Sequence, residues 1–194
     1  MNSLIPIVSF FLIGLAVKYI DASYDDNVFS RRLASILSPF VGVLLGVIMA
    51  SNHPLLVLSV SIIAGVFITG KLDILPFRLL VAVALLLCAI SNQGKLLATQ
   101  SDWYVLFAFT FGAVLDEIGN DLADANALKG VANFFFTNRG CLKFAALSFI
   151  AFRFLPFVPV LAFLGFDLGY LIVSRISLLR IHARLHPLEQ LHLH

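Results

Sequence analysis

Apolar residues fill most of the chain in long runs, and short polar segments separate these runs. A helix that crosses a membrane needs about 20 mostly apolar residues, with about 17 to 25 tolerated. By this criterion the pattern predicts seven spans, near residues 3–20, 34–51, 54–70, 74–91, 102–116, 141–155 and 157–174. Pro156 and Pro159 interrupt the last apolar stretch. We interpret this break as a hairpin between two helices, and one kinked helix is the alternative.

The composition places the chain among membrane proteins. Hydrophobic residues make up 60% of it, charged residues only 12%, and the mean hydropathy is +1.00. A soluble domain carries about a quarter charged residues, so this chain cannot cover itself with a polar surface. We therefore expect an all-α fold, a polytopic helical bundle formed by residues 1–174 as one domain. Residues 175–194 are expected to form a basic amphipathic tail in the cytoplasm.

The basic residues indicate how the bundle is oriented. With seven spans, every lysine and arginine except Lys95 and Arg153 lies on the same side. Cytoplasmic loops carry such an excess, so we predict a multi-pass protein of the cell membrane with its N-terminus outside and its C-terminus inside. The net charge is only +2, and we expect membrane lipid rather than nucleic acid as a partner.

Two clusters of acidic residues fall at the predicted cytoplasmic ends of the first and fifth spans. The clusters are Asp21, Asp25 and Asp26, and Asp116, Glu117, Asp121 and Asp124. Carboxylates this close repel one another unless a cation lies between them, and Mg²⁺ binds one or two carboxylates together with substrate phosphates. We therefore predict that the two clusters meet on one side of the membrane and hold a cation such as Mg²⁺. In the alternative interpretation these acids are solvated and pair with neighbouring lysine and arginine residues.

Basic residues follow both clusters and could bind phosphate oxygens. The candidates are Arg31, Arg32, Lys129 and Arg139. Separately, Asp167 lies in the middle of the last predicted span, where an ionisable group is costly and indicates function. Asp167 is expected either to be neutral because it is desolvated, or to pair with Arg78 or Lys18 from a neighbouring span.

The segment DASYD, followed by Arg31-Arg32 and Pro39, resembles the first Asp-rich motif of the intramembrane prenyltransferases (the UbiA superfamily). The segment DEIGNDLAD resembles their second motif. The resemblance implies that these segments bind Mg²⁺ and a prenyl diphosphate. The candidate metal ligands that it implies are Asp21, Asp25, Asp116, Asp121 and Asp124. The chain departs from the family in its shorter length, its fewer predicted spans, and the absence of the asparagine that opens the first motif.

The leading hypothesis is a membrane-embedded, Mg²⁺-dependent enzyme that acts on an isoprenoid or other lipid diphosphate through the two aspartate clusters. A small cation channel or ion-coupled transporter with Asp167 in the pathway is an alternative from another class. A third possibility is a non-catalytic membrane subunit that docks a partner through residues 116–140. Whether the protein is an enzyme is left open by the sequence.

Overall fold

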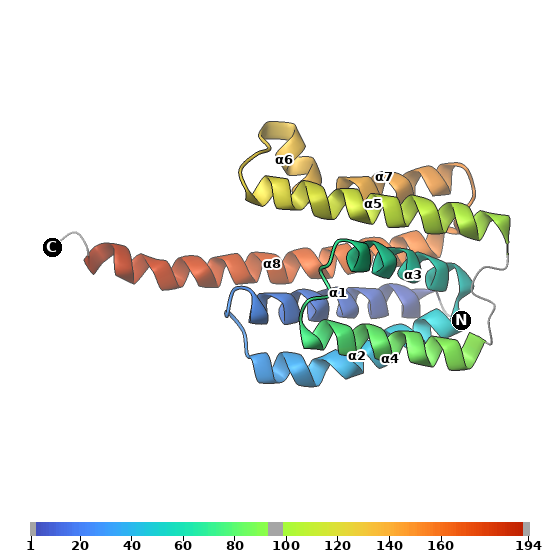
Figure 1. Ribbon diagram of the computed structural model, residues 1–194, viewed down its shortest axis with the longest axis horizontal. Helices are drawn as coiled ribbons and strands as arrows, with labels where there is room; N and C mark the ends of the chain where they lie inside the picture. Colours follow the sequence, from blue (N-terminus) through green and yellow to red (C-terminus); the bar gives the residue numbers. More distant parts are fainter. Residues whose placement is uncertain (1–2, 93–98, 192–194) are drawn as a thin grey trace.

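The computed structural model describes residues 3–92 and 99–191, and within these ranges it contains eight α-helices and no strand. The helices are α1 (Leu4–Tyr24), α2 (Arg31–Ser51), α3 (His53–Ile68), α4 (Leu75–Asn92), α5 (Gln100–Asp124), α6 (Gly130–Thr137), α7 (Gly140–Ala151) and α8 (Phe157–Leu191). The long helices run back and forth side by side in one bundle (Figure 1). The prediction of an all-α helical fold is confirmed.

Three helices are long and apolar enough to cross a membrane: α1, α2 and residues Phe157–Ala183 of α8. Their length and composition indicate a membrane protein. Helices α3, α4 and α7 are apolar but shorter. Helix α5 spans 25 residues and carries four acidic residues in its last three turns. The count of seven spans and the orientation therefore remain predictions.

Helices α1 and α8 pack in parallel along most of α1, although they are remote in the sequence. Gly14 faces the backbone of Phe166, so closely that an added Cβ would lie 2.0 Å from the Phe166 carbonyl oxygen. Further along, Gly169 lies against Phe11 and Leu15 in the same way. Small residues of this kind let helix backbones approach closely in lipid. Helices α2 and α4 pack together, and so do α3 and α5.

The apolar stretch from residue 142 to 174 forms two helices and not one. Helix α7 ends at Ala151, and α8 begins at Phe157 directly after Pro156. Arg153 adopts a left-handed backbone conformation (φ 59°) in the turn between them. Proline suits the first turn of a helix because that position needs no N–H donor. The hairpin is therefore the correct interpretation of this break.

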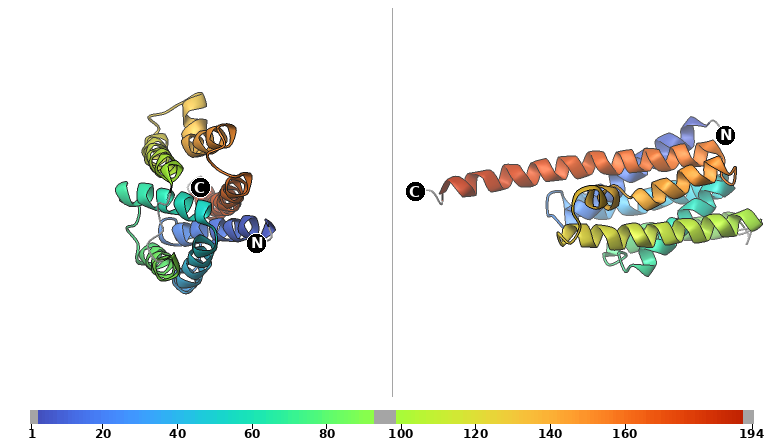
Figure 2. Two further views of the ribbon diagram at one scale, coloured as in Figure 1. Left: turned by 90° about the vertical axis from the view of Figure 1, so that its right-hand side faces the viewer. Right: turned by 90° about the horizontal axis from the view of Figure 1, so that it is seen from above.

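Two elements extend beyond the predicted spans. Helix α5 continues through the second acidic cluster to Asp124, and α8 continues in one piece through the predicted tail to Leu191. Beyond the other helices α8 projects alone (Figure 2). The start of this projection contacts the α1–α2 loop, where Ser177 donates a hydrogen bond to Asp26 (2.9 Å) and the Arg180 guanidinium lies over the Phe29 ring.

Helix α6 was not predicted. It lies across the end of α5, where the Phe136 ring covers Gly119, and the Phe135 ring covers Gly140 at the start of α7. A side chain at either glycine would collide with these rings. The aromatic residues of the 125–139 segment thus fold that segment back onto the bundle.

Candidate functional site

Members of both acidic clusters line one pocket, which has a volume of about 480 Å³ and is lined by residues of α1, α2, α3, α4, α5 and α8. We call it the acidic pocket. Its charged lining residues are Lys18, Asp21, Asp25, Asp26, Lys71, Asp73, Glu117, Asp124 and Arg139. Its interior is apolar and includes Phe10, Ile13, Leu45, Phe77, Leu80 and Phe163. A polar entrance above an apolar interior suits an amphiphilic molecule.

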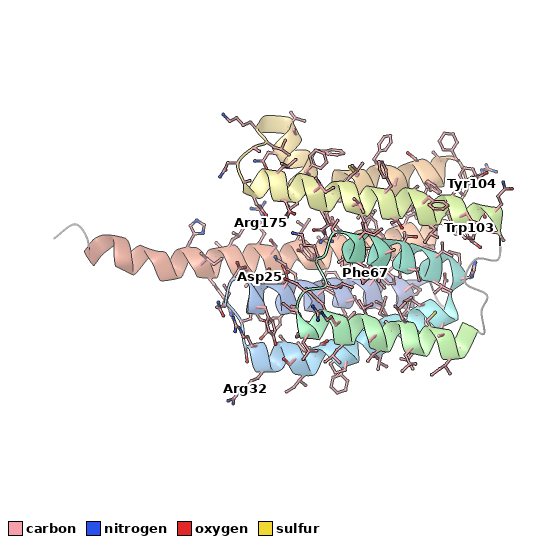
Figure 3. All side chains as sticks on the ribbon, viewed as in Figure 1. Asp25, Arg32, Phe67, Trp103, Tyr104 and Arg175 are labelled. Carbon is pink, nitrogen blue, oxygen red and sulfur yellow. The ribbon has the colours of Figure 1, made fainter. Side chains whose placement is uncertain are left out.

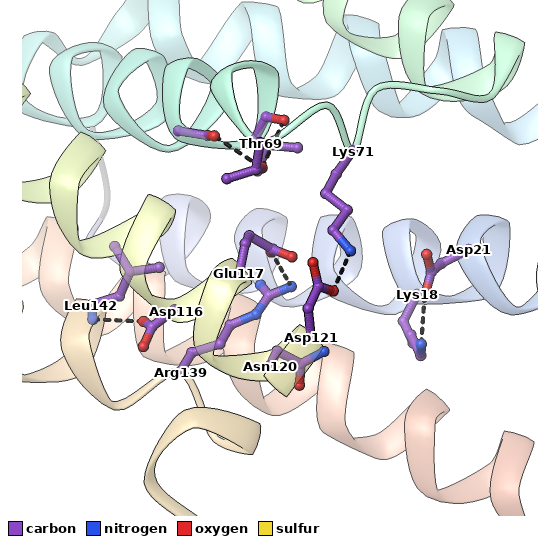
Figure 4. A network of polar contacts seen from close by, with 12 residues as sticks. Lys18, Asp21, Thr69, Lys71, Asp116, Glu117, Asn120, Asp121, Arg139 and Leu142 are labelled. Atoms are coloured by element: carbon purple, nitrogen blue, oxygen red, sulfur yellow. Dashed lines mark hydrogen bonds and ion pairs between the residues drawn. The ribbon is translucent and has the colours of Figure 1, made fainter. Parts of the chain in front are cut away.

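Several acids of the two clusters already have cationic partners. Lys18 pairs with Asp21 on α1, and Lys71 reaches from the α3–α4 loop to Asp121 on α5, with 2.6 Å between Nζ and Oδ1 (Figure 4). These contacts agree with the alternative interpretation that Asp21 and Asp121 pair with nearby lysines. The pKa of Lys71 is raised, chiefly because its ammonium group donates a hydrogen bond to Asp121. Asp121 itself is exposed and does not line the pocket.

Other acids of the pocket are left without such partners. Among the described residues, Asp25, Asp73 and Asp124 form no ion pair. The pKa of Asp25 is raised, first by partial burial and then by the neighbouring carboxylates of Asp21 and Asp73. These three sites leave surplus negative charge at the entrance, and a bound cation would relieve it.

Arg139 is the one predicted phosphate-binding residue that lines the acidic pocket. It immediately precedes α7 in a left-handed conformation (φ 52°). Its guanidinium carbon lies 4.3 Å from the centre of the Tyr170 ring, and Nη2 lies 3.8 Å from Oε1 of Glu117. Burial acts to lower the pKa of Arg139, but Tyr170 and nearby carboxylates outweigh it and raise the pKa. Arg139 is thus charged and fixed at the pocket wall.

The other predicted phosphate-binding residues lie elsewhere. Arg31 donates to the carbonyl oxygens of Ser23 and Tyr24 and to Oδ1 of Asn27 (2.6 Å), so it stabilises the end of α1. Arg32 is exposed and points away from the bundle (Figure 3). Lys129 is exposed at the start of α6 and does not line the pocket.

Asp116, predicted as a metal ligand, forms a buried contact between two helices. Its carboxylate accepts hydrogen bonds from the backbone N–H groups of Cys141 (2.9 Å) and Leu142 (2.8 Å) in the first turn of α7. Arg139, at the N-cap of α7, makes no side-chain cap bond, so Asp116 caps α7 from α5. Asp116 is only 2% exposed and is absent from the pocket lining. Its place in the structure indicates a structural role.

The partner of Asp167 is neither of the two expected residues. Buried Asp167 forms an ion pair with Lys143 of α7, with 2.7 Å between Oδ2 and Nζ. Arg78 instead donates to the carbonyl oxygens of Leu72 and Asp73 at the start of α4. Lys143 lies in the other arm of the predicted hairpin, so the sequence made it a possible partner of Asp167 that was overlooked.

Ser59 of α3 was also missed by the sequence analysis. Its side chain lines the apolar part of the acidic pocket and is 5% exposed, and its Oγ has no hydrogen-bond partner among the residues that the structure describes. Buried hydroxyls are almost always hydrogen-bonded. A molecule in the pocket could supply the missing partner.

In the part of the chain that the structure describes, no three His, Cys, Asp or Glu side chains are grouped closely enough to hold a metal ion by themselves. Mg²⁺ does not require such a group, since it keeps several waters and binds one or two carboxylates together with phosphates. Asp25, Asp73 and Asp124 fit that limited protein contribution. The predicted metal site thus stays a hypothesis.

No family model matches this chain, and no curated protein or solved structure is similar to it. The resemblance to the intramembrane prenyltransferases is therefore confined to the two short aspartate-containing segments.

Proposed function

We propose that this chain is a multi-pass membrane protein that binds an isoprenoid or other lipid diphosphate in the acidic pocket together with Mg²⁺, and acts on it as an enzyme. The single observation that carries this proposal is the pocket itself, which combines surplus carboxylates at its entrance with an apolar interior. The head group would lie among the charged residues and the hydrocarbon chain among the apolar ones.

The charge of the entrance is the reason for including the metal. A diphosphate is strongly anionic, and Asp25, Asp73 and Asp124 would repel it. Mg²⁺ between carboxylates and phosphate oxygens removes this repulsion and stabilises the negative charge of a departing diphosphate. Arg139 and Lys18 line the same pocket and could donate hydrogen bonds to phosphate oxygens.

The proposed orientation is N-terminus outside and C-terminus inside, with the acidic pocket open to the cytoplasm. Asp25, Arg32 and Arg175 lie toward one end of the bundle, and Trp103 and Tyr104 lie at the other (Figure 3). Basic residues at the cytoplasmic side and aromatic residues at an interface are both typical of membrane proteins. These positions support the orientation.

The test compares Asp25→Asn and Asp73→Asn with the matched control Asp121→Asn, since Asp121 lies outside the pocket lining. The protein is placed in lipid nanodiscs, and binding of farnesyl diphosphate and release of diphosphate are measured as Mg²⁺ is titrated. We expect each pocket variant to need about tenfold more Mg²⁺, because a charge-assisted contact is lost. The control should behave as the wild type. Unchanged Mg²⁺ dependence in both pocket variants would eliminate the proposal.

An ion-coupled transporter is the second candidate, and the buried Asp167–Lys143 pair is the observation that favours it. Paired ionisable groups inside a membrane protein often belong to ion or proton pathways. Two results together would favour the transporter over the enzyme. Ion flux into liposomes is lost in the double variant Asp167→Asn/Lys143→Met, and farnesyl diphosphate does not bind to the wild type. The double variant avoids leaving one buried charge unpaired.

A further inference from the structure

A second pocket, of about 600 Å³, adjoins the acidic pocket on the side of α6. Five residues line both pockets and form the wall between them: Lys18, Asn120, Asp124, Arg139 and Tyr170. On the far side of this wall the lining differs. It includes carboxamide and hydroxyl groups from α6, the α6–α7 turn and α8, namely Asn133, Thr137, Asn138 and Ser174. We call this the polar pocket.

The amides of the polar pocket are held in place by local hydrogen bonds. Asn138 donates to the carbonyl oxygen of Phe134 (2.7 Å), and Asn133 accepts from the Thr137 hydroxyl (2.9 Å). Asn120 donates to Asp124 (3.2 Å). Each amide is thereby oriented, while Oδ1 of Asn138 and Oδ1 of Asn120 form no hydrogen bond with the described residues. Oriented polar groups around a cavity are typical of binding sites for small polar molecules.

Most charges around the polar pocket cancel in pairs. Buried Asp167 is neutralised by Lys143, while Arg139 lies beside Glu117. Lys18 is paired with Asp21. A ligand would therefore gain little net attraction from any of these groups.

Two residues of the lining, which carry opposite charges, are not part of these ion pairs. Arg175 of α8 and Asp124 of α5 form no ion pair with any described residue. Both are exposed and lie on different walls of the polar pocket. A purely anionic ligand would suit only Arg175, and a purely cationic ligand only Asp124. A molecule that carries both charges satisfies both residues.

We propose that the polar pocket binds a small zwitterion that presents an ammonium group to Asp124 and a phosphate or carboxylate group to Arg175. The same chemistry occurs in a free solute such as phosphoethanolamine and in the head group of phosphatidylethanolamine. The oriented amides supply further hydrogen bonds to the oxygens of the ligand. This site adjoins the lipid diphosphate site and shares Asp124 with it, but the binding of a zwitterion does not rest on the proposed function.

The test measures binding of phosphoethanolamine to the purified protein by isothermal titration. Ethanolamine and inorganic phosphate serve as probes, since the first carries only the positive group and the second only the negative one. The wild type should bind phosphoethanolamine about tenfold more tightly than either, because each probe forms only one of the two charge-assisted contacts. Arg175→Gln should weaken phosphoethanolamine binding about tenfold and leave Mg²⁺ binding at the acidic pocket unchanged.

The matched controls come from the same helices. Arg180→Gln on α8 and Asp121→Asn on α5 remove one charge each without touching the polar pocket, since neither residue lines it. Both should bind phosphoethanolamine as the wild type does. Equal affinity in the wild type and Arg175→Gln, or phosphate binding as tight as phosphoethanolamine binding, would overturn the proposal. So would the absence of phosphoethanolamine binding to the wild type.

Two further arms separate the sources of the zwitterion. In nanodiscs, phosphatidylethanolamine that displaces phosphoethanolamine supports a lipid head group as the ligand. If phosphatidylethanolamine and phosphatidylglycerol nanodiscs give equal phosphoethanolamine affinities, the ligand is a free solute. Either result requires that Arg175→Gln binds phosphoethanolamine more weakly than Arg180→Gln does.

Discussion

The contact between Asp116 and the first turn of α7 allows a quantitative prediction. The substitution Asp116→Ala removes two hydrogen bonds, to the N–H groups of Cys141 and Leu142. A hydrogen bond to an ionised group contributes about 1.5–3 kcal/mol, so the two together contribute about 3–6 kcal/mol. The substitution also removes the desolvation cost of burying the carboxylate, which offsets part of this loss. We therefore expect the free energy of unfolding to fall by about 2–4 kcal/mol.

The variant Asp116→Asn keeps one acceptor oxygen and should lose about half as much stability. Thermal unfolding in mild detergent, followed by circular dichroism, measures the global effect. Hydrogen–deuterium exchange of the peptide that contains residues 139–143 measures the local one, because its amide hydrogens lose their acceptors. Asp124→Asn is a suitable control, since that carboxylate is exposed and caps no helix.

The outcome also separates a structural role of Asp116 from a role as metal ligand. We expect farnesyl diphosphate binding by Asp116→Asn to depend on Mg²⁺ as in the wild type, while the backbone amides at the start of α7 exchange hydrogen faster. If Asp116→Ala melts with the wild type and the start of α7 exchanges no faster, the reasoning about this cap is wrong. If Asp116→Asn loses Mg²⁺ binding without loss of stability, Asp116 is a ligand after all.

Three other predictions concern packing and charge. Lys143→Met should lower the free energy of unfolding by about 3–5 kcal/mol because it leaves Asp167 buried and unpaired. Adding Asp167→Asn should restore much of the lost melting temperature, and a double variant as unstable as Lys143→Met would contradict this. Gly14→Val should separate α1 from α8 because its Cβ would meet the Phe166 carbonyl oxygen, so a wild-type melting temperature would contradict the close packing. The pKa of Asp25 is raised in the fold, so ionising its carboxyl group costs stability. The protonated carboxyl group therefore favours the folded state below the ordinary pKa of 3.8, and this contribution is lost as pH rises through the folded pKa. Asp25→Asn should therefore raise the melting temperature at neutral pH in EDTA, with a smaller gain toward pH 4, and a destabilised variant at neutral pH would refute this.

The length of the apolar runs predicted helices well where a run and a helix coincide. The predicted span 34–51 corresponds to α2, and 74–91 to α4. The span 102–116 ended too early, since Asp116 ends the apolar run but not the helix. The side chain of Asp116 is buried by α7, and the following acids face solvent or the pocket, so α5 continues to Asp124.

Long-range contacts were harder to predict from the sequence. That the two acidic clusters would share a pocket could be proposed, because both fall at helix ends on one predicted side. The predicted hairpin already made the helices of Lys143 and Asp167 neighbours, and their ion pair depends on how each helix is rotated. The return of α6 onto Gly119 depends on packing between distant parts of the chain. No local pattern gives the rotation of a helix about its axis, so the sequence did not single out one partner for Asp167.

The parallel packing of α1 on α8 has a consequence for biosynthesis. During translation α1 is made long before α8, and until then Gly14 has no α8 backbone to pack against. Both pockets take lining residues from α1 and from α8. Neither pocket is therefore complete on the nascent chain until α8 has been made and has packed on α1.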